Sequence, residues 1–150
     1  MDGDFTISQS VAANIYVGDK LGLNRGINSA RDRAKAVQYM QDASDLVGEF
    51  FRFALGAAAA GPTHDLSALK TFVEGGRLTS WLTNIEHSIR GPFYFGTHPT
   101  YVDFYLLQNL DWMDDVALDK LRAKASPPLL PERVLVVCLS WVLAPGRPAT

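Results

Sequence analysis

The chain has 150 residues, of which 47% are hydrophobic and 20% are charged. This balance is typical of a folded globular protein and argues against disorder, and one domain of this length can bury a sizeable core. The net charge of −2 gives no reason to expect a nucleic acid or an acidic membrane as a partner.

The cysteine content, the N-terminal residues and the length of the longest apolar run together predict a cytoplasmic protein. The sequence has one cysteine, Cys138, which excludes an internal disulfide and fits a reducing compartment. The first four residues lack the apolar core of a signal peptide. The longest apolar run, residues 134–139, is far shorter than the roughly 20 residues that cross a bilayer. We expect neither a membrane partner nor a metal site, since the three histidines form no ligand-spaced pair.

The N-terminal segment predicts a short strand followed by a helix. Residues 5–7 are β-like, although a single short strand needs neighbours and the next strand-like run begins only at residue 134. Gln9 and Ser10 then open a helix that ends near Gly18 or Gly22. A serine at this point is either a plain helix cap or part of an anion site, because free amides at a helix N-terminus suit a carboxylate.

Two long helical regions follow. The first is predicted from about residue 29 to residue 59, and the second from 66 to 89, with a break at Gly75-Gly76. On the first helix, apolar residues that recur every three or four positions predict the buried face. These residues are Ala30, Ala34, Val37, Met40, Val47, Phe50, Phe51 and Ala54. Acidic residues on the other side, among them Asp42, Asp45 and Glu49, are typical of a solvated face.

An aromatic loop over residues 91–96 leads into a strongly capped helix that is expected to run to Trp112 or Met113. Thr100 is a good N-cap, and Asp103 lies three residues later, so that its carboxylate can accept a hydrogen bond from the Thr100 amide in a capping box. Pro99 and Phe104 hold the two positions of a hydrophobic staple. The helix is almost continuously apolar after the cap, which predicts that it lies in the core. A short helix over 116–125 and a divergent tail over 126–150 complete the chain.

In this order and spacing, the segments resemble the cytosolic glutathione transferases, and most closely the class that contains the sigma, pi, mu and alpha enzymes. The Gln9-Ser10 pair, the long helix and the Thr100–Asp103 box carry the resemblance. It implies a mainly α fold in three parts. Residues 1–24 would be a remnant of the thioredoxin-like N-terminal domain, residues 25–125 the helical C-terminal domain, and residues 126–150 a divergent tail.

The resemblance also implies a binding site. Gln9 and Ser10 match the pair that binds the γ-glutamyl part of glutathione. Asp45, or Asp42 in the alternative register, matches an aspartate that reaches across a dimer to the amino group of the ligand. Phe50, Phe51 and Leu55 would face the electrophile pocket, although the two phenylalanines fit equally well as core residues. Glutathione would be a co-substrate, and no resident cofactor is implied.

Catalysis in this family depends on a Tyr, Ser or Cys near the start of the thioredoxin-like domain, which favours the glutathione thiolate. No residue of this sequence matches it, so no catalytic residue is assigned. The sequence therefore predicts a truncated glutathione transferase, with poor affinity for glutathione and little or no conjugation of glutathione to electrophiles. The alternatives are a non-catalytic helical interaction module and an unrelated helical domain. Both a homodimer and a monomer are compatible with the sequence.

Overall fold

The computed structural model describes residues 3–59 and 67–113, and of residues 54–59 only the backbone. Within these ranges the chain forms five helices and no strand, which confirms the mainly α fold class. The strand expected over residues 5–7 is not confirmed. The helix expected over 116–125 and the tail over 126–150 lie outside the described residues.

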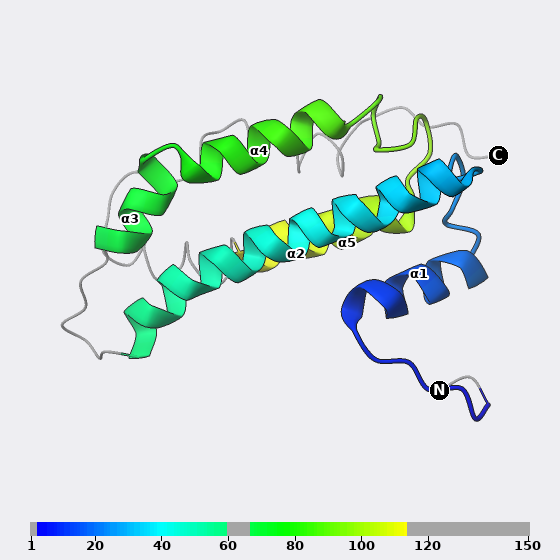
Figure 1. Ribbon diagram of the computed structural model, residues 1–150, viewed down its shortest axis with the longest axis horizontal. Coiled ribbons are helices and arrows are strands. Elements are labelled where there is room, and N and C mark those ends of the chain that lie inside the picture. Colours follow the sequence, from blue (N-terminus) through cyan, green and yellow to red (C-terminus); the bar gives the residue numbers. More distant parts are fainter. Residues whose placement is uncertain (1–2, 60–66, 114–150) are drawn as a thin grey trace.

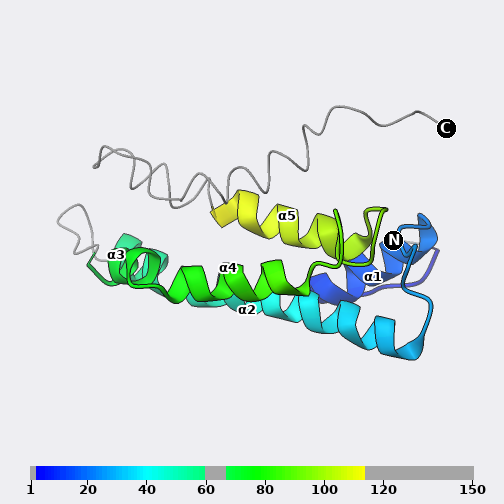
Figure 2. The ribbon, with the colours of Figure 1, turned by 90° about the horizontal axis from the view of Figure 1, so that it is seen from above.

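The longest helix, α2 (Ala30–Ala59), is the element on which the others pack (Figures 1 and 2). α5 (Tyr101–Met113) lies beside it and runs in the same direction, whereas α4 (Arg77–Ser88) runs in the opposite direction. α3 (Ser67–Glu74) joins the far end of α2 to α4, and α1 (Ser10–Lys20) lies near the start of α2. The molecule is therefore a bundle in which α2 and α5 share the longest interface.

α2 begins at a complete capping box that was not predicted from the sequence. The Ser29 hydroxyl accepts a hydrogen bond from the Asp32 amide at 3.0 Å. In return, the Asp32 carboxylate accepts from the Ser29 amide at 3.1 Å and from its hydroxyl at 2.6 Å. These contacts satisfy amides that have no partner within the helix and fix the first residue of α2.

The buried face of α2 differs from the predicted one in its first half. Ala30, Ala34 and Val37 are exposed, so their assignment to the core was wrong. The buried positions keep the three-and-four spacing but begin only at Ala36; they are Ala36, Tyr39, Met40, Ala43, Leu46 and Phe50. Tyr39 explains the difference, since its ring stacks on that of Tyr94 with the centroids 4.7 Å apart.

The break between α3 and α4 lies at the predicted glycine pair. The Gly75 amide donates a hydrogen bond to the Thr71 carbonyl at 2.8 Å, and a side chain at position 75 would collide with that same oxygen. Gly76 then adopts a φ of 88°, a left-handed conformation that glycine accepts without a steric cost. The chain turns here because only glycine fits both positions.

α5 is largely buried, as predicted, with one exception. Val102, Tyr105 and Leu106 face the core, but Phe104 is 48% exposed. Its assignment to the core was therefore wrong, and the exposed ring does not support the staple with Pro99. A helix in contact with α1 and α2 on one side still has an outer face.

α1 is fastened to the beginning of α5. The Tyr101 amide donates a hydrogen bond to the Leu23 carbonyl, in the segment that follows α1, at 2.9 Å. Gly18 is buried directly against the Tyr101 side chain, and a Cβ atom at position 18 would approach the Tyr101 ring to 2.5 Å. The absence of a side chain at Gly18 thus allows the two helices to come close.

Candidate functional site

The head of α1 has an unusual backbone conformation. Gln9 is the N-cap of the helix and has φ 73° and ψ 121°, and its side chain makes no capping hydrogen bond. Within the described residues it is the only non-glycine residue with a positive φ. Such conformations cost about 1–3 kcal/mol and cluster at binding sites. Gln9 and Ser10 are both exposed, and the amides of the first turn have no acceptor within the helix.

A chain of three hydroxyl groups connects Ser10 to the core. The Ser10 Oγ lies 3.0 Å from the Tyr105 Oη on α5, and the same Oη lies 2.7 Å from the Ser44 Oγ on α2. The Ser44 hydroxyl in turn donates to the Met40 carbonyl at 3.1 Å. Tyr105 is only 5% exposed, so the chain leads from the surface into the bundle.

The two candidate aspartates lie on α2 close to this chain in sequence. Asp45 is exposed and Asp42 is half-buried. No hydrogen bond or ion pair joins either of them to Gln9 or Ser10 within the described part of the chain. The charge of Asp42 instead affects Tyr94. Burial is the main cause of the raised pKa of Tyr94, and the charges of Asp103 and Asp42 add to it.

The two phenylalanines expected at an electrophile pocket lie in an aromatic cluster. Phe50 is only 2% exposed and packs edge-on against Phe51 and Phe72. Phe51 is half-buried, and its ring centroid lies 4.0 Å from that of Trp112 on α5. Leu55 belongs to α2, but its side chain lies outside the described residues. The cluster joins α2, α3 and α5.

The capping box at the start of α5 is buried. Asp103 accepts hydrogen bonds from the Thr100 amide and hydroxyl, both at 2.7 Å, and from the Tyr94 amide at 2.9 Å. The reciprocal half differs from the expectation, because the Asp103 amide donates to the Thr100 carbonyl and not to its hydroxyl. Burial raises the pKa of Asp103, although these hydrogen bonds lower it in part. The box therefore fixes the loop over residues 94–100 as well as α5.

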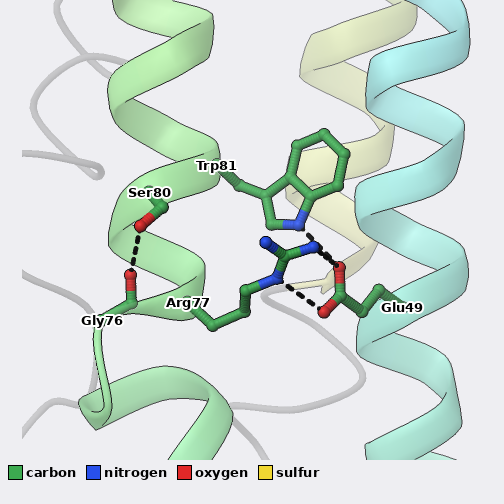
Figure 3. A network of polar contacts seen from close by, with 5 residues as sticks. All are labelled: Glu49, Gly76, Arg77, Ser80 and Trp81. Carbon is green, nitrogen blue, oxygen red and sulfur yellow. Dashed lines mark hydrogen bonds and ion pairs between the residues drawn. The ribbon is translucent and has the colours of Figure 1, made fainter.

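A charged cluster joins α2 to α4 (Figure 3). The Arg77 Nε and Nη2 donate to the two oxygens of Glu49 at 2.8 and 2.9 Å, and the Trp81 Nε1 donates to Glu49 at 2.8 Å. The Arg77 hydrogen bond, followed by that of Trp81, holds the pKa of Glu49 below its usual range. Three donors from α4 converge on both oxygens of Glu49, so we interpret this cluster as a connection between α2 and α4 and not as a ligand site.

Two residues of the hydroxyl chain were missed in the sequence. Ser44 lies between the acidic residues of α2, and Tyr105 lies within an apolar run, so neither has a motif of its own. The one available signal was chemical, because a buried tyrosine hydroxyl usually requires a polar partner.

No protein-family model matches the chain, and no match was found among curated proteins or solved structures. Among the described residues, no group of three or more His, Cys, Asp or Glu side chains could hold a metal ion. None of the described helices is both long and apolar enough to span a bilayer. The head of α1 is the candidate site because the strained backbone of Gln9 lies there and the hydroxyl chain behind Ser10 connects it to the core.

Proposed function

We propose that this chain is a glutathione transferase-like protein that binds the γ-glutamyl group of glutathione at Gln9 and Ser10. The observation that carries the proposal is the φ of 73° at Gln9, because backbone strain persists where a binding site requires it. The exposed Ser10 hydroxyl and the free amides of the first turn of α1 are suited to a carboxylate. Asp45 would contact the amino group from the other subunit of a dimer.

The residues proposed for this site would serve the binding of glutathione and not its chemical conversion. The residues that match the family pattern would hold the γ-glutamyl carboxylate, whereas none matches the residue that activates the glutathione sulfur. We therefore expect this chain to bind glutathione weakly and to conjugate it slowly, or not at all, to an electrophile such as a chlorinated nitrobenzene.

An NMR titration with glutathione tests the proposal. Ser10→Ala should lower the affinity about ten-fold, as expected for a lost hydrogen bond to a charged group. Ser8→Ala is the matched control, because Ser8 is equally exposed and precedes the helix; its affinity should equal that of the wild type. The proposal is wrong if glutathione does not bind, or if Ser8→Ala and Ser10→Ala have the same effect.

One observation favours a second candidate, a non-catalytic interaction module. Val17 and Leu21 are exposed apolar residues spaced four apart at the end of α1, and Phe5 and Ile7 add further exposed apolar surface before the helix. A homodimer through this face would place Val17 in the interface. Sedimentation of the wild type and of Val17→Glu tests this candidate, since a monomeric wild type, or a dimer unaffected by the substitution, would contradict it.

A further inference from the structure

The direction of the hydroxyl chain behind Ser10 can be deduced from the bond that Ser44 donates to the Met40 carbonyl. A hydroxyl group has one proton to donate, and a carbonyl oxygen can only accept. The Ser44 proton is given to the Met40 carbonyl, so in the contact between Tyr105 and Ser44 the donor is Tyr105. Tyr105 has then no further proton, and in its contact with Ser10 the donor is Ser10. The proton of Ser10 therefore points into the protein.

This direction is the wrong one for an anion. A carboxylate has only acceptors, so Ser10 can bind it only by turning its proton outward. The Ser10 oxygen can then accept from Tyr105, and Tyr105 can accept from Ser44. Only the bond from the Ser44 hydroxyl to the Met40 carbonyl is lost. That carbonyl keeps its ordinary helical bond from the amide four residues later.

We infer that Tyr105 and Ser44 form a reversible relay that sets the direction of the Ser10 hydroxyl, which donates inward in the free protein and outward to a bound γ-glutamyl carboxylate. The inference rests on the proposed function, since it concerns the same site. Tyr105 and Ser44 are positioning residues, because neither touches the ligand. Neighbouring hydroxyl bonds strengthen one another when they run in one direction, so the three groups reverse together.

The relay makes Ser44 a restraint on binding. In the wild type, reversal breaks the bond from Ser44 to Met40, whereas in Ser44→Ala there is no such bond to break. The proton of Tyr105 is then free to be donated to Ser10 before the ligand arrives. Ser44→Ala should therefore bind glutathione about two- to five-fold more tightly, the range that corresponds to one weak net hydrogen bond.

A double-mutant cycle tests the relay. Ser44→Ala should tighten binding in the wild-type background and have no effect in a Tyr105→Phe background, because the connection to Ser10 is then cut. Ser88→Ala is the matched control, since the Ser88 hydroxyl makes the same bond to the carbonyl four residues earlier, at 2.9 Å, in α4. Equal effects of Ser44→Ala in both backgrounds, or no effect in either, would overturn the inference.

A second measurement reads the direction itself. The Raman Fermi doublet of tyrosine distinguishes a phenol that donates strongly from one that accepts, and the difference spectrum against Tyr105→Phe isolates Tyr105. The doublet should change when glutathione binds. It should stay unchanged with γ-aminobutyryl-cysteinyl-glycine, the analogue that lacks the γ-glutamyl carboxylate. The same response to both ligands would contradict the relay.

The two proposals can fail separately. If the wild type does not bind glutathione, the proposed function is wrong and the relay has no anion to respond to, so both are rejected. If glutathione binds and Ser10→Ala weakens it, but the cycle shows no coupling between Ser44 and Tyr105, only the relay is rejected.

Discussion

Asp32 and Asp103 hold the same position in two capping boxes, but only the Asp103 carboxylate is buried. Each accepts from the amide and the hydroxyl of the residue three positions earlier. Asp103 accepts one more bond, from the Tyr94 amide. The two boxes therefore allow a comparison of one motif at the surface, where the carboxylate is half-buried, and in the core.

Asp103→Ala should lower the free energy of unfolding by about 2–4 kcal/mol, because it removes the cap and leaves buried donors without a partner. Asp32→Ala should cost clearly less, since the Asp32 carboxylate is only half-buried and water can reach the donors that it leaves. Urea unfolding of the two variants measures the difference. Equal losses would show that burial does not decide the strength of the box.

The contribution of Asp103 to the free energy of unfolding should decrease as the pH rises, whereas that of most aspartates increases. Burial raises its pKa in the folded protein, so the folded state binds the proton more tightly than the unfolded one. The contribution of this group to stability is complete below the unfolded pKa of about 3.9. It is lost as the pH rises through the raised folded value.

Urea unfolding of the wild type and Asp103→Asn, at a series of pH values, checks this sign. The advantage of the wild type over the variant should be largest in acid and shrink as the pH rises. An advantage that grows with pH would mean that the hydrogen bonds outweigh burial.

The contribution of Glu49 to stability should depend on pH in the opposite direction and increase as the pH rises. The hydrogen bonds from Arg77 and Trp81 lower its pKa, so its stabilising contribution is present above the unfolded pKa of about 4.3. That contribution is lost as the pH falls through the lower folded value. The stability difference between the wild type and Glu49→Gln should be largest near neutral pH and disappear in acid.

Glu74→Gln is the control for this prediction. Glu74 pairs with Lys70 at 3.8 Å, and both side chains are largely exposed, so the substitution should have little effect at any pH. Thermal unfolding over the same pH series compares the two variants. A pH-independent effect of Glu49→Gln would contradict this connection between α2 and α4.

Two helical glycines should respond to alanine in opposite ways. A Cβ atom at Gly18 would collide with the Tyr101 side chain, whereas nothing lies within 4 Å of one at Gly48. Gly18→Ala should destabilise the protein by about 1–3 kcal/mol. Gly48→Ala should stabilise it by about 1 kcal/mol through helix propensity. Melting temperatures provide the measurement, and a stabilising Gly18→Ala would show that α1 and α5 are not closely packed.

The sequence predicted the helices better than the faces that they bury. The glycine pair at 75–76 and the Thr100–Asp103 box were confirmed as helix boundaries, because both act locally. The face of α2 was misplaced, because Ala30, Ala34 and Val37 fit the helical period as well as the true core does. Tyr39 was left out since its burial depends on stacking with Tyr94, which is a contact between distant parts of the chain.

Only the exposed residues of the candidate site could be predicted from the sequence. Gln9 and Ser10 were identified from a motif, and the motif carried no information on the backbone conformation of Gln9. The partners of Ser10 could not be found, because Tyr105 lies 95 positions later in the sequence. The spacing of neighbouring residues in the sequence does not show which of several buried tyrosines forms a hydrogen bond with a given serine.

The attachments of α1 have a consequence for the order of folding. The Leu23 carbonyl, Gly18 and Ser10 all meet residues at the beginning of α5, the last of the described helices to be synthesised. Closing so long a stretch of chain is slow compared with the formation of local helix contacts. α1 precedes the other described helices in the chain, so its contacts with α5 form only after the whole of the bundle between them has been synthesised, and until then its apolar residues Val11 and Ile15 lack these partners.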